Sequence, residues 1–479
     1  MTPMEHLDTS SGLPRVVIIG GGFAGLEVAK KLRHAPVEIL LLDKHNYHTF
    51  QPLLYQVASG GIEAESIAFP IRRIFSTQKN FVFRMAEVQR IEAEKNLIHT
   101  EIGPIKYDYL VVATGADTNF FGNQEIQHYS MPMKSIPEAL NLRSMILQNL
   151  ELALVEKDPV KRAALMTFVV VGGGPTGVEL SGSLGELRNK VLTKEYPELN
   201  PDDMKVYLVE GKPRVLGTFS EPASAKAAKF LKKMNVQVSN GVHVKSYNGY
   251  ELVIDDGRTI LTRNVLWSAG VVGALPPGIT NGSVIRGNRL QTDAFCRVKG
   301  FDNVFAIGDV SVVITDKSPE GFPGVAQVAI QEGGHLAKNI IRLCKNEPLK
   351  PFKYFDRGSL ATIGRNKAVA DLGFIRFQGF FAWLIWMFVH LMSLVGARNR
   401  LIVFINWAGS YFTFNSITRL IIRRFDRGAI KNDSTDPNAP VVNTTAARDS
   451  STPSANASAV PAEGTPPPAN AATATPQVG

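Results

Sequence analysis

The fold is decided by a stretch that occurs twice in the chain, as RVVIIGGGFAG at residues 15–25 and as TFVVVGGGPTG at residues 167–177. In both copies a run of β-branched residues leads into three glycines, and a stretch with helical spacing follows. This order predicts a buried strand, a tight turn and a helix, which together open a dinucleotide-binding βαβ unit. Two copies predict two such domains in one chain.

The glycines of each copy have separate tasks at the phosphates of a dinucleotide. Gly20 permits the tight turn, Gly22 lets a pyrophosphate approach the backbone, and Gly25 allows the helix to pack closely on the strand. The unpaired N–H groups and the positive dipole end of the helix then favour the phosphates. The second copy is predicted to use Gly172, Gly174 and Gly177 in the same way.

A carboxylate is expected at the end of the second strand of each unit, where it accepts hydrogen bonds from ribose hydroxyls. Asp43 follows the strand-like run at 37–42, and Glu210 follows the run at 205–209. The Glu210 assignment is the weaker one, because residues 188–203 lengthen the connection beyond the usual ~20 residues.

The carboxylate of the second unit also bears on the choice between NADH and NADPH. Glu210 favours NADH, since it binds the ribose 2′-OH and repels a 2′-phosphate. Lys212 and Arg214 lie close to it in the sequence and keep NADPH as the alternative. Gly270 is assigned to the NADH site as well.

Two further segments resemble fingerprints of the flavoprotein disulfide-reductase superfamily and indicate which dinucleotide is FAD. YDYLVVATGA, which includes Thr114 and Gly115, resembles the strand and turn at which these folds pass between domains. NVFAIGDV resembles the second FAD fingerprint, in which Gly308 lets the backbone approach the cofactor and Asp309 accepts from the ribityl chain. The order of the segments implies an α/β fold with two Rossmann-like domains, the NADH domain being inserted in the FAD domain.

Charge and cysteine content narrow the function classes. The 479 residues carry a net charge of +9 and only two cysteines. Cys296 and Cys344 are far apart and lack CxxC spacing, so they predict neither a disulfide scaffold nor a cysteine-built metal site. Residues 45–60, where disulfide reductases of this fold carry a CxxxxC pair, contain no cysteine. Disulfide exchange is therefore excluded, no metal site is predicted, and another electron acceptor is required.

Four segments are similar, in family order, to the type II NADH:quinone oxidoreductases, the single-subunit alternative NADH dehydrogenases. They are TFQPLLYQVASG at 49–60, AQVAIQEG at 326–333, LATIGR at 360–365, and GARNRL at 396–401 followed by Asn406 and Trp407. The resemblance spans about residues 14–426 of the chain. It implies an FAD enzyme that oxidises NADH and reduces a membrane quinone without pumping protons.

The resemblance gives Glu179 a place in catalysis. Glu179 comes two residues after Gly177, and in the family a carboxylate there lies between nicotinamide and flavin. Buried beside a flavin, it would stabilise developing charge or relay a proton toward the quinone. Its alternative is a first-turn acid that complements the helix dipole.

The resemblance also places the quinone. Gln327 and Gln331 would hydrogen-bond the quinone carbonyls, with Pro52 and Leu53 beside them. A helix that begins near Ala326, assigned to the FAD site, would aim its amino terminus at the flavin. The alternative for the two glutamines is one solvated helix face.

The positive charge is concentrated in one apolar part of the chain. Residues 365–431 hold ten basic residues against two acidic ones and thus +8 of the charge. Residues 377–397 and 401–418 have no charged side chain. The first run is long enough to span a bilayer, but Trp383 and Trp386 near its middle and the arginines after it favour helices that lie in the headgroup layer.

This pattern predicts amphipathic helices that attach the chain to anionic lipid on the cytoplasmic side of the inner membrane, and it argues against nucleic acid as the partner. A hairpin that spans the bilayer is the alternative. Part of the same apolar surface would also serve the homodimer that we expect.

Composition changes, together with the domain order that the superfamily resemblance implies, predict six segments. They are a disordered lead-in at 1–13, the first part of the FAD domain at 14–118, the NADH domain at 119–290, the second part of the FAD domain with quinone-side elements at 291–374, membrane-anchoring helices at 375–431 and a disordered Ala/Pro/Ser/Thr-rich tail at 432–479.

Three alternative functions stay open: a sulfide:quinone oxidoreductase, an NADPH-preferring relative, and a flavin redox sensor resembling apoptosis-inducing factor.

Overall fold

The structure is a computed structural model that describes residues 12–279, 282–315, 318–319, 321–373, 375–413 and 418–421. Contacts divide the chain into residues 1–427 and 428–479, and every described residue lies within 1–427. The predictions that fall outside the described residues are the lead-in up to residue 11, the tail at 432–479, and the membrane role of Arg423, Arg424, Arg427 and Lys431.

The first glycine-rich unit opens the expected parallel sheet. Its strand order is β22 (Val304–Ala306), β9 (Tyr109–Val112), β1 (Arg15–Ile19), β2 (Glu38–Asp43) and β5 (Phe81–Met85). All neighbouring strands are parallel. Because β22 comes from the second predicted part of the FAD domain, the sheet itself joins the two parts.

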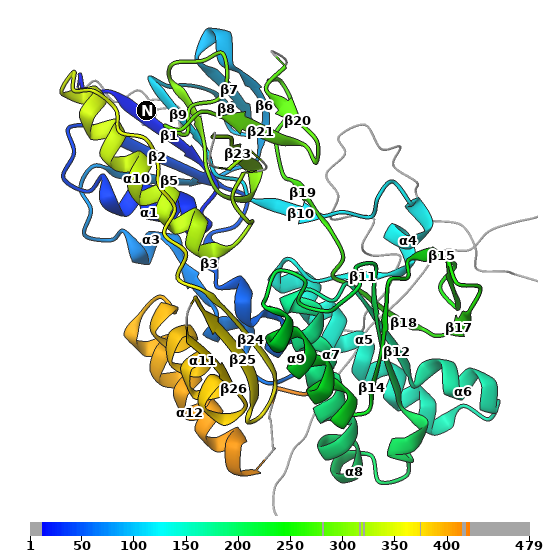
Figure 1. Cartoon of the computed structure of the whole chain (residues 1–479). Coiled ribbons are helices and arrows are strands. Elements are labelled where there is room, and N and C mark those ends of the chain that lie inside the picture. Colours follow the sequence, from blue (N-terminus) through cyan, green and yellow to red (C-terminus); the bar gives the residue numbers. More distant parts are fainter. Residues whose placement is uncertain are drawn as a thin grey trace, which may run out of the picture. The chain divides into compact units, whose positions relative to one another are not determined.

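The two faces of this sheet are covered differently. On one face lie the helices α1 (Phe23–Lys31) and α10 (Ala326–Cys344), which bury Leu26 and Leu336 against it (Figure 1). On the other face lies a meander whose residues Ile91, Ile98 and Ile105 join the core. The meander consists of β6 (Val88–Glu92), β7 (Leu97–Thr100) and β8 (Gly103–Lys106).

The chain between β2 and β5 forms short elements that later contribute to the site. They are β3 (Tyr47–Thr49), η1 (Gln51–Leu53), α2 (Leu54–Ala58), η2 (Ala64–Ser66), β4 (Ala68–Pro70) and α3 (Ile71–Ile74). Leu53, Leu54 and Val57 pack against Ala139 and Leu142 of the second unit and so belong to its hydrophobic core.

A two-stranded antiparallel bridge connects the two sheets (Figure 1). The chain leaves through β10 (Ala116–Thr118) and returns through β19 (Val271–Gly273). After β19 it packs on the first unit again, where the Ile91 N–H donates to the Pro277 carbonyl at 2.9 Å. The predicted end of the inserted domain at residue 290 is therefore wrong, because the return occurs at β19. The two valines at 271–272 continue the apolar pattern of the residues before them. The sequence therefore did not indicate that the chain returns to the first unit here.

The chain that follows β19 completes the first unit. β20 (Val284–Ile285), β21 (Arg289–Thr292) and β23 (Ser311–Val313) form a three-stranded sheet there. The turn η6 (Gly308–Val310) lies between β22 and β23.

The second glycine-rich unit also builds a five-stranded parallel sheet. Its order is β11 (Met131–Pro132), β18 (Asn264–Trp267), β12 (Thr167–Val171), β13 (Lys205–Glu210) and β14 (Val236–Asn240). Its main helices are α5 (Ile136–Val155), α7 (Pro175–Glu186) and α9 (Glu221–Lys233). α5 begins with a capping box in which Ser135 and Glu138 satisfy each other's backbone N–H groups, which fixes its first turn.

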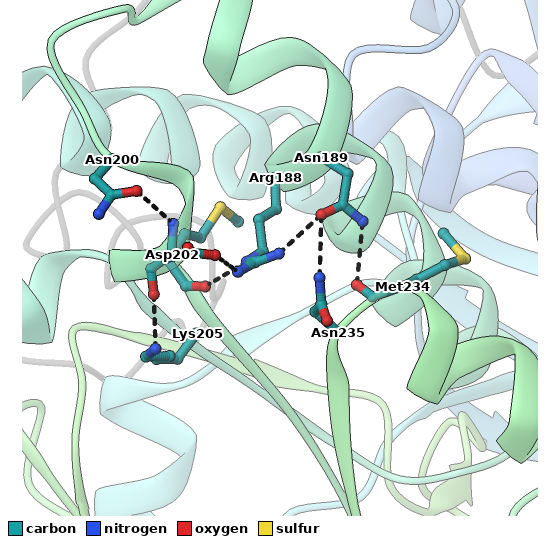
Figure 2. A network of polar contacts seen from close by, with 8 residues as sticks. Arg188, Asn189, Asn200, Asp202, Lys205, Met234 and Asn235 are labelled. Carbon is teal, nitrogen blue, oxygen red and sulfur yellow. Dashed lines mark hydrogen bonds and ion pairs between the residues drawn. The ribbon is translucent and has the colours of Figure 1, made fainter.

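The long connection before Glu210 is folded and is held in place by the polar contacts of one arginine. It runs through η4 (Leu187–Val191), α8 (Leu192–Glu195) and η5 (Pro201–Asp203), of which η4 is a π-helical turn. Figure 2 shows the buried Arg188 guanidinium at its centre, paired with Asp202 at 2.7 Å and bonded to Asn189 at 2.8 Å. Arg188 also donates to the Met204 carbonyl at 2.9 Å. These bonds close the insertion, so that β13 still starts in register beside β12.

The C-terminal part forms a small sheet covered by two helices. These elements are β24 (Ser359–Gly364), β25 (Lys367–Leu372), β26 (Ile375–Gln378), α11 (Phe380–Ser393) and α12 (Ala397–Thr413). The predicted start of the helices at residue 375 is wrong, since β26 pairs with β25 there. In the part of the chain that the structure describes, no helix has both the length and the apolar character needed to cross a bilayer.

Candidate functional site

Both glycine-rich loops have the shape that a dinucleotide requires. A Cβ on Gly25 would clash with the Gly20 carbonyl oxygen, and one on Gly177 would clash with that of Gly172. By contrast, no other group lies within 4 Å of a Cβ placed on Gly22 or on Gly174. In each loop two positions are therefore packed against the sheet, while the position at the helix start is open to a phosphate. The loops fit the expected cofactor and substrate.

The two predicted ribose-binding acids hold the loops themselves. The Asp43 carboxylate accepts from the Gly21 N–H at 2.6 Å and from the His45 N–H at 2.7 Å. Burial raises the pKa of Asp43, and these two bonds oppose the rise. The sequence did not predict that the acid also holds the glycine loop, because the strand end and the loop become neighbours only in the folded structure.

The position of Glu210 in the second unit corresponds to the position of Asp43 in the first unit. Its carboxylate accepts from the Gly173 N–H and, at 2.7 Å, from the Lys212 N–H. The Arg214 guanidinium donates to the carbonyls of Leu216 at 3.3 Å and Gly217 at 2.9 Å.

The segments predicted to complete the FAD site also contain polar groups and free space that suit a cofactor. Thr114 has a buried hydroxyl without a hydrogen-bond partner among the described residues, and no other group lies within 4 Å of a Cβ on Gly115. Gly308 has φ +74°, and its N–H donates at 2.6 Å to the Glu332 carboxyl. Asp309 follows in η6 and is half-buried.

Glu332 was missed by sequence reasoning although it lies in the AQVAIQEG segment. It is buried on α10, and burial raises its pKa to about 8, the Gly308 amide opposing the rise and the Asp309 charge adding to it. An acid on the buried face of an amphipathic helix was the available signal.

Gly270 lies in the crossing between the two units. Its φ is +72°, and a Cβ there would clash with the ring of Phe121. The preceding residues, Ser268 and Ala269, contact the loop at Gly172. Gly270 therefore lies next to the second glycine loop, as an NADH-binding position requires.

Glu179 is buried at the junction of the second unit with the C-terminal sheet. It is 7% exposed, and its carboxyl accepts a long hydrogen bond from the Thr362 N–H at 3.4 Å. The junction is tight, because a Cβ on Gly182 would clash with the Ile363 carbonyl oxygen.

The Glu179 carboxyl is neutral over a wide pH range. Burial raises its pKa to about 8, opposed by the Thr362 amide and the Trp386 indole N–H. The indole nitrogen faces this carboxyl but falls short of hydrogen-bond geometry. Glu179 is thus more than a first-turn acid beside a helix dipole.

Gln327 and Gln331 hold the loop that precedes β24. Gln327 donates to the Gly358 carbonyl at 3.0 Å and accepts from the Arg357 N–H at 3.3 Å. Gln331 donates to the Phe355 carbonyl at 2.9 Å and accepts from the Phe355 N–H at 3.0 Å. Both side chains are therefore held by the backbone of this loop, which a merely solvated helix face does not require. Since an amide NH₂ has two donors, each side chain is fixed in orientation and keeps one further N–H.

Ala326, which was assigned to the FAD site, is the first residue of α10. The two other positions predicted beside the quinone differ in exposure. Pro52 is half-buried, whereas Leu53 has 0% exposure inside the core formed by α2 and α5. Only Pro52 of this pair is exposed at the surface.

Tyr55, Gln56 and Trp407 lie in segments that carry the family resemblance, but the sequence assigned them no role in the site; the structure brings them together. Trp407 donates to the Gln56 Oε1 atom at 2.8 Å, and Gln56 donates to the Tyr55 hydroxyl at 2.9 Å. Trp386, predicted to lie in the headgroup layer, is buried and packs against Tyr55 and His390. That prediction is wrong for Trp386, because the helix turns this face toward the protein core.

The opposite face of α11 and α12 is apolar and exposed. Phe381 is 68% exposed, Phe388 65% and Leu401 59%, and other side chains extend the patch. The further members are Phe380, Leu384, Val389, Met392, Phe404 and Ile405. We call this set the apolar face of α11 and α12.

Neither cysteine resembles a redox group. Cys296 is fully buried, Cys344 is half-buried, and both pack in the core of the first unit as free thiols. Burial raises the pKa of each thiol. Over the described ranges, no three His, Cys, Asp or Glu side chains are grouped closely enough to hold a metal ion.

Two family models match the chain. The model described as pyridine nucleotide-disulphide oxidoreductase matches residues 14–333, and the model described as NDH2 C-terminal domain matches residues 357–414. The second match coincides with the C-terminal sheet and helices.

Individual relatives and solved structures agree with these two matches. The type II NADH:quinone oxidoreductase NdhA of Mycobacterium tuberculosis is 40% identical over 418 residues, which cover 84% of this chain and 87% of that protein. The internal alternative NAD(P)H-ubiquinone oxidoreductase A1 of Arabidopsis thaliana mitochondria is 32% identical over 442 residues, with 85% and 86% covered. Among solved structures, NDH2 of Plasmodium falciparum has a TM-score of 0.77 at 21% identity and covers 86% of this chain and 100% of that one.

Proposed function

This chain belongs to the type II NADH:quinone oxidoreductases within the pyridine nucleotide-disulphide oxidoreductases, and on that premise we propose which residues bind FAD, NADH and the quinone. The protein is an FAD-dependent oxidoreductase that oxidises NADH and reduces a quinone. The overall reaction is NADH + H⁺ + Q → NAD⁺ + QH₂. FAD, when bound, supplies the two-electron chemistry that links the two substrates.

FAD is assigned to the first unit. Gly20, Gly22 and Gly25 hold its pyrophosphate at the start of α1, and Asp43 holds a ribose. Thr114, Gly115, Gly308, Asp309 and Ala326 complete the site. The buried Thr114 hydroxyl and the open space beside Gly22 and Gly115 support this assignment.

NADH is assigned to the second unit through Gly172, Gly174, Gly177, Glu210 and Gly270. Glu210 lies at the strand end and faces the loop, where it accepts from a ribose 2′-OH. A 2′-phosphate would be repelled by this carboxylate, and two N–H groups of Arg214 already donate to backbone carbonyls. We therefore propose NADH, and not NADPH, as the physiological donor.

The quinone is assigned to the side of Gln327, Gln331 and Pro52. The loop at 355–358 fixes both amides, and the remaining N–H of each donates to a quinone oxygen. Leu53 shapes the site from the core without touching the quinone.

Glu179 is the central residue of the proposed mechanism. The proposal rests on the buried position of this residue beneath β24. Because its pKa is about 8, the carboxyl holds a proton at pH 7 and donates it to the quinone as electrons arrive. No described helix spans a bilayer, and we propose that turnover pumps no protons.

The apolar face of α11 and α12 is proposed to dock on the membrane that holds the quinone. Exposed apolar patches of this size mark interaction sites. Arg376, Arg398 and Arg400 lie on the same segment, where they meet anionic lipid headgroups. We place this contact on the cytoplasmic side of the inner membrane and expect a homodimer.

The experiment is an anaerobic stopped-flow measurement on the purified yellow protein. NADH bleaches the flavin absorbance, a quinone restores it, and NADPH bleaches it much more slowly. Bleaching by sulfide in place of NADH would contradict the proposal and favour the sulfide:quinone alternative, against which the two buried cysteines argue. Bleaching without recovery by a quinone would favour the redox sensor.

A further inference from the structure

The middle glycine of the first loop is held at both of its backbone polar groups. The Gly21 N–H donates to the Asp43 carboxylate at 2.6 Å, and the Gly21 carbonyl oxygen lies 3.0 Å from Nδ1 of His48. Because a carbonyl oxygen only accepts, Nδ1 carries the ring proton and donates it. His48 is not among the residues assigned to FAD above.

The ring of His48 is fixed in place by its surroundings. His48 is 3% exposed on β3, where it pairs with Phe69 of β4. The ring of Phe23, the first residue of α1, meets it edge-on with 5.1 Å between the ring centroids. Burial lowers the pKa of His48 to about 4, the bond to Gly21 opposes this shift, and the Lys30 charge adds to it. The imidazole is therefore neutral at pH 7.

The bond to His48 sets the direction of the next N–H group. In a planar trans peptide, the carbonyl and the N–H that follows it point to opposite sides. With the Gly21 carbonyl turned to the imidazole, the Gly22 N–H points away from His48. Gly22 is also the position with room for a phosphate, because no other group lies within 4 Å of a Cβ there. His48 thus orients an N–H donor at the start of α1.

The second loop holds the same two backbone groups without a histidine. The Gly173 N–H donates to the Glu210 carboxylate, and the Gly173 carbonyl accepts from the Leu216 N–H at 2.7 Å. A backbone amide thus takes the place that the imidazole of His48 has in the first loop. Since the two loops fix this carbonyl by different means, a fixed carbonyl is a shared requirement of both and not a by-product of packing around one histidine.

We propose that His48 is a positioning residue for FAD, whose Nδ1–H holds the Gly21 carbonyl so that the Gly22 N–H is turned toward the FAD pyrophosphate. This inference rests on the proposed assignment of FAD to the first loop. It adds a residue whose loss loosens the cofactor while the loop glycines and Asp43 stay in place.

The test compares side chains that place a donor at different points of the imidazole. The holoenzyme of each variant is diluted, and the rise of FAD fluorescence gives the rate of cofactor release. His48→Leu has no donor, so it should release FAD about tenfold faster or more, because the carbonyl of the buried Gly21 is left without its partner. Asn carries its amide nitrogen on Cγ, as histidine carries Nδ1, so His48→Asn should release FAD within about threefold of the wild-type rate.

His48→Gln is the matched control for the position of the donor. Its amide nitrogen lies one bond further from the backbone, close to the place of Nε2, so it should release FAD as fast as His48→Leu. His34→Leu, which changes an exposed histidine of the same unit, should release FAD at the wild-type rate. The contrast between Asn and Gln decides the proposal even where the leucine variant does not fold.

Two results would overturn the positioning role: release of FAD by His48→Leu at the wild-type rate, or release by His48→Asn as fast as by His48→Gln. The assignment of FAD to the first loop fails in a different way. Gly22→Ala adds a Cβ that meets no other group within 4 Å but fills the space for the phosphate, so this variant should purify without FAD. A yellow Gly22→Ala variant with the wild-type release rate would contradict that assignment, whatever the His48 variants do.

Discussion

A single buried carboxyl, that of Glu332, fixes the turn that carries Asp309. It does so with a hydrogen bond to the Gly308 N–H, and the charge that acts on it comes from Asp309, which disfavours its ionised form. Its pKa of about 8 keeps it neutral at pH 7. In the unfolded chain the pKa of the same group is near its ordinary value of 4.5.

Glu332→Gln should therefore change the pH dependence of stability. In wild type the raised pKa stabilises the fold fully below pH 4.5, and this contribution is lost as pH rises toward 8. The neutral amide does not titrate, so the variant should gain stability relative to wild type between pH 5 and pH 8, on the order of 3 kcal/mol. Thermal unfolding at both pH values measures this, with the exposed Glu198→Gln as the control. Parallel melting curves at the two pH values would contradict it.

Gln331→Ala removes two hydrogen bonds to Phe355 and the amide proposed to donate to the quinone. Quinone reduction should slow about tenfold or more, because an oriented donor is lost. Reduction of ferricyanide, which needs no quinone site, should remain near wild type. Steady-state assays with both acceptors measure the difference, and Gln127→Ala, an exposed glutamine, is the control. Equal loss with both acceptors would point to general damage.

The sequence predicted individual residues well where one local segment determines their position. Gly22, Asp43 and Glu210 follow from strand, turn and helix signals that lie close together. Tyr55 and Trp386 did not, since their surroundings are built by segments hundreds of residues apart. Trp386 was misplaced for this reason: its helix is apolar on every face, so hydropathy did not tell the protein side from the exposed side.

At the scale of elements, the contact between α7 and β24 joins the NADH unit to the C-terminal sheet. Gly182 makes it possible, because its missing side chain lets the helix approach the Ile363 carbonyl. The same approach brings the Thr362 N–H to Glu179. The βαβ units were predicted from periodicity, whereas this contact and the strand β26 were not, since short strands beside an apolar helix give no distinct period.

Gly182→Ala should push β24 away from α7. Overpacking of this kind costs about 1 to 3 kcal/mol of unfolding free energy, and Glu179 loses its amide partner. Melting temperature and kcat for quinone should both fall. Gly334→Ala is the matched control, because a Cβ on this helical glycine meets only a side chain at 3.7 Å. A stable variant with full quinone activity would show that the contact tolerates expansion.

At the scale of the whole molecule, the exposed apolar surface and the basic charge lie on the same C-terminal segment. Phe388 is 65% exposed on α11 and Leu401 is 59% exposed on α12, so together they sample both helices of the apolar face. The predicted membrane function of this segment remains a prediction, although its arrangement as two helices on a small sheet is now known.

Phe388→Ser combined with Leu401→Ser should weaken binding to anionic vesicles about a hundredfold, since each exposed side chain contributes about 1.5 kcal/mol or more on burial in lipid. Activity with a water-soluble quinone should persist. Vesicle co-sedimentation measures binding. Val155→Ser, at an apolar position of the NADH unit that is 73% exposed, should bind as wild type does. Unchanged co-sedimentation of the double variant would place the membrane contact elsewhere.

The enclosure of Glu179 has a consequence for the synthesis of this enzyme. Thr362 and Trp386 close around that carboxyl, and Trp407 holds the glutamine next to Tyr55, yet both nucleotide-binding units are complete before these residues leave the ribosome. A nascent chain can therefore begin to form its two Rossmann units first, and the surroundings of Glu179 close only when translation is nearly finished. A chain cut short before Trp386 would leave the Glu179 carboxyl without the indole that faces it.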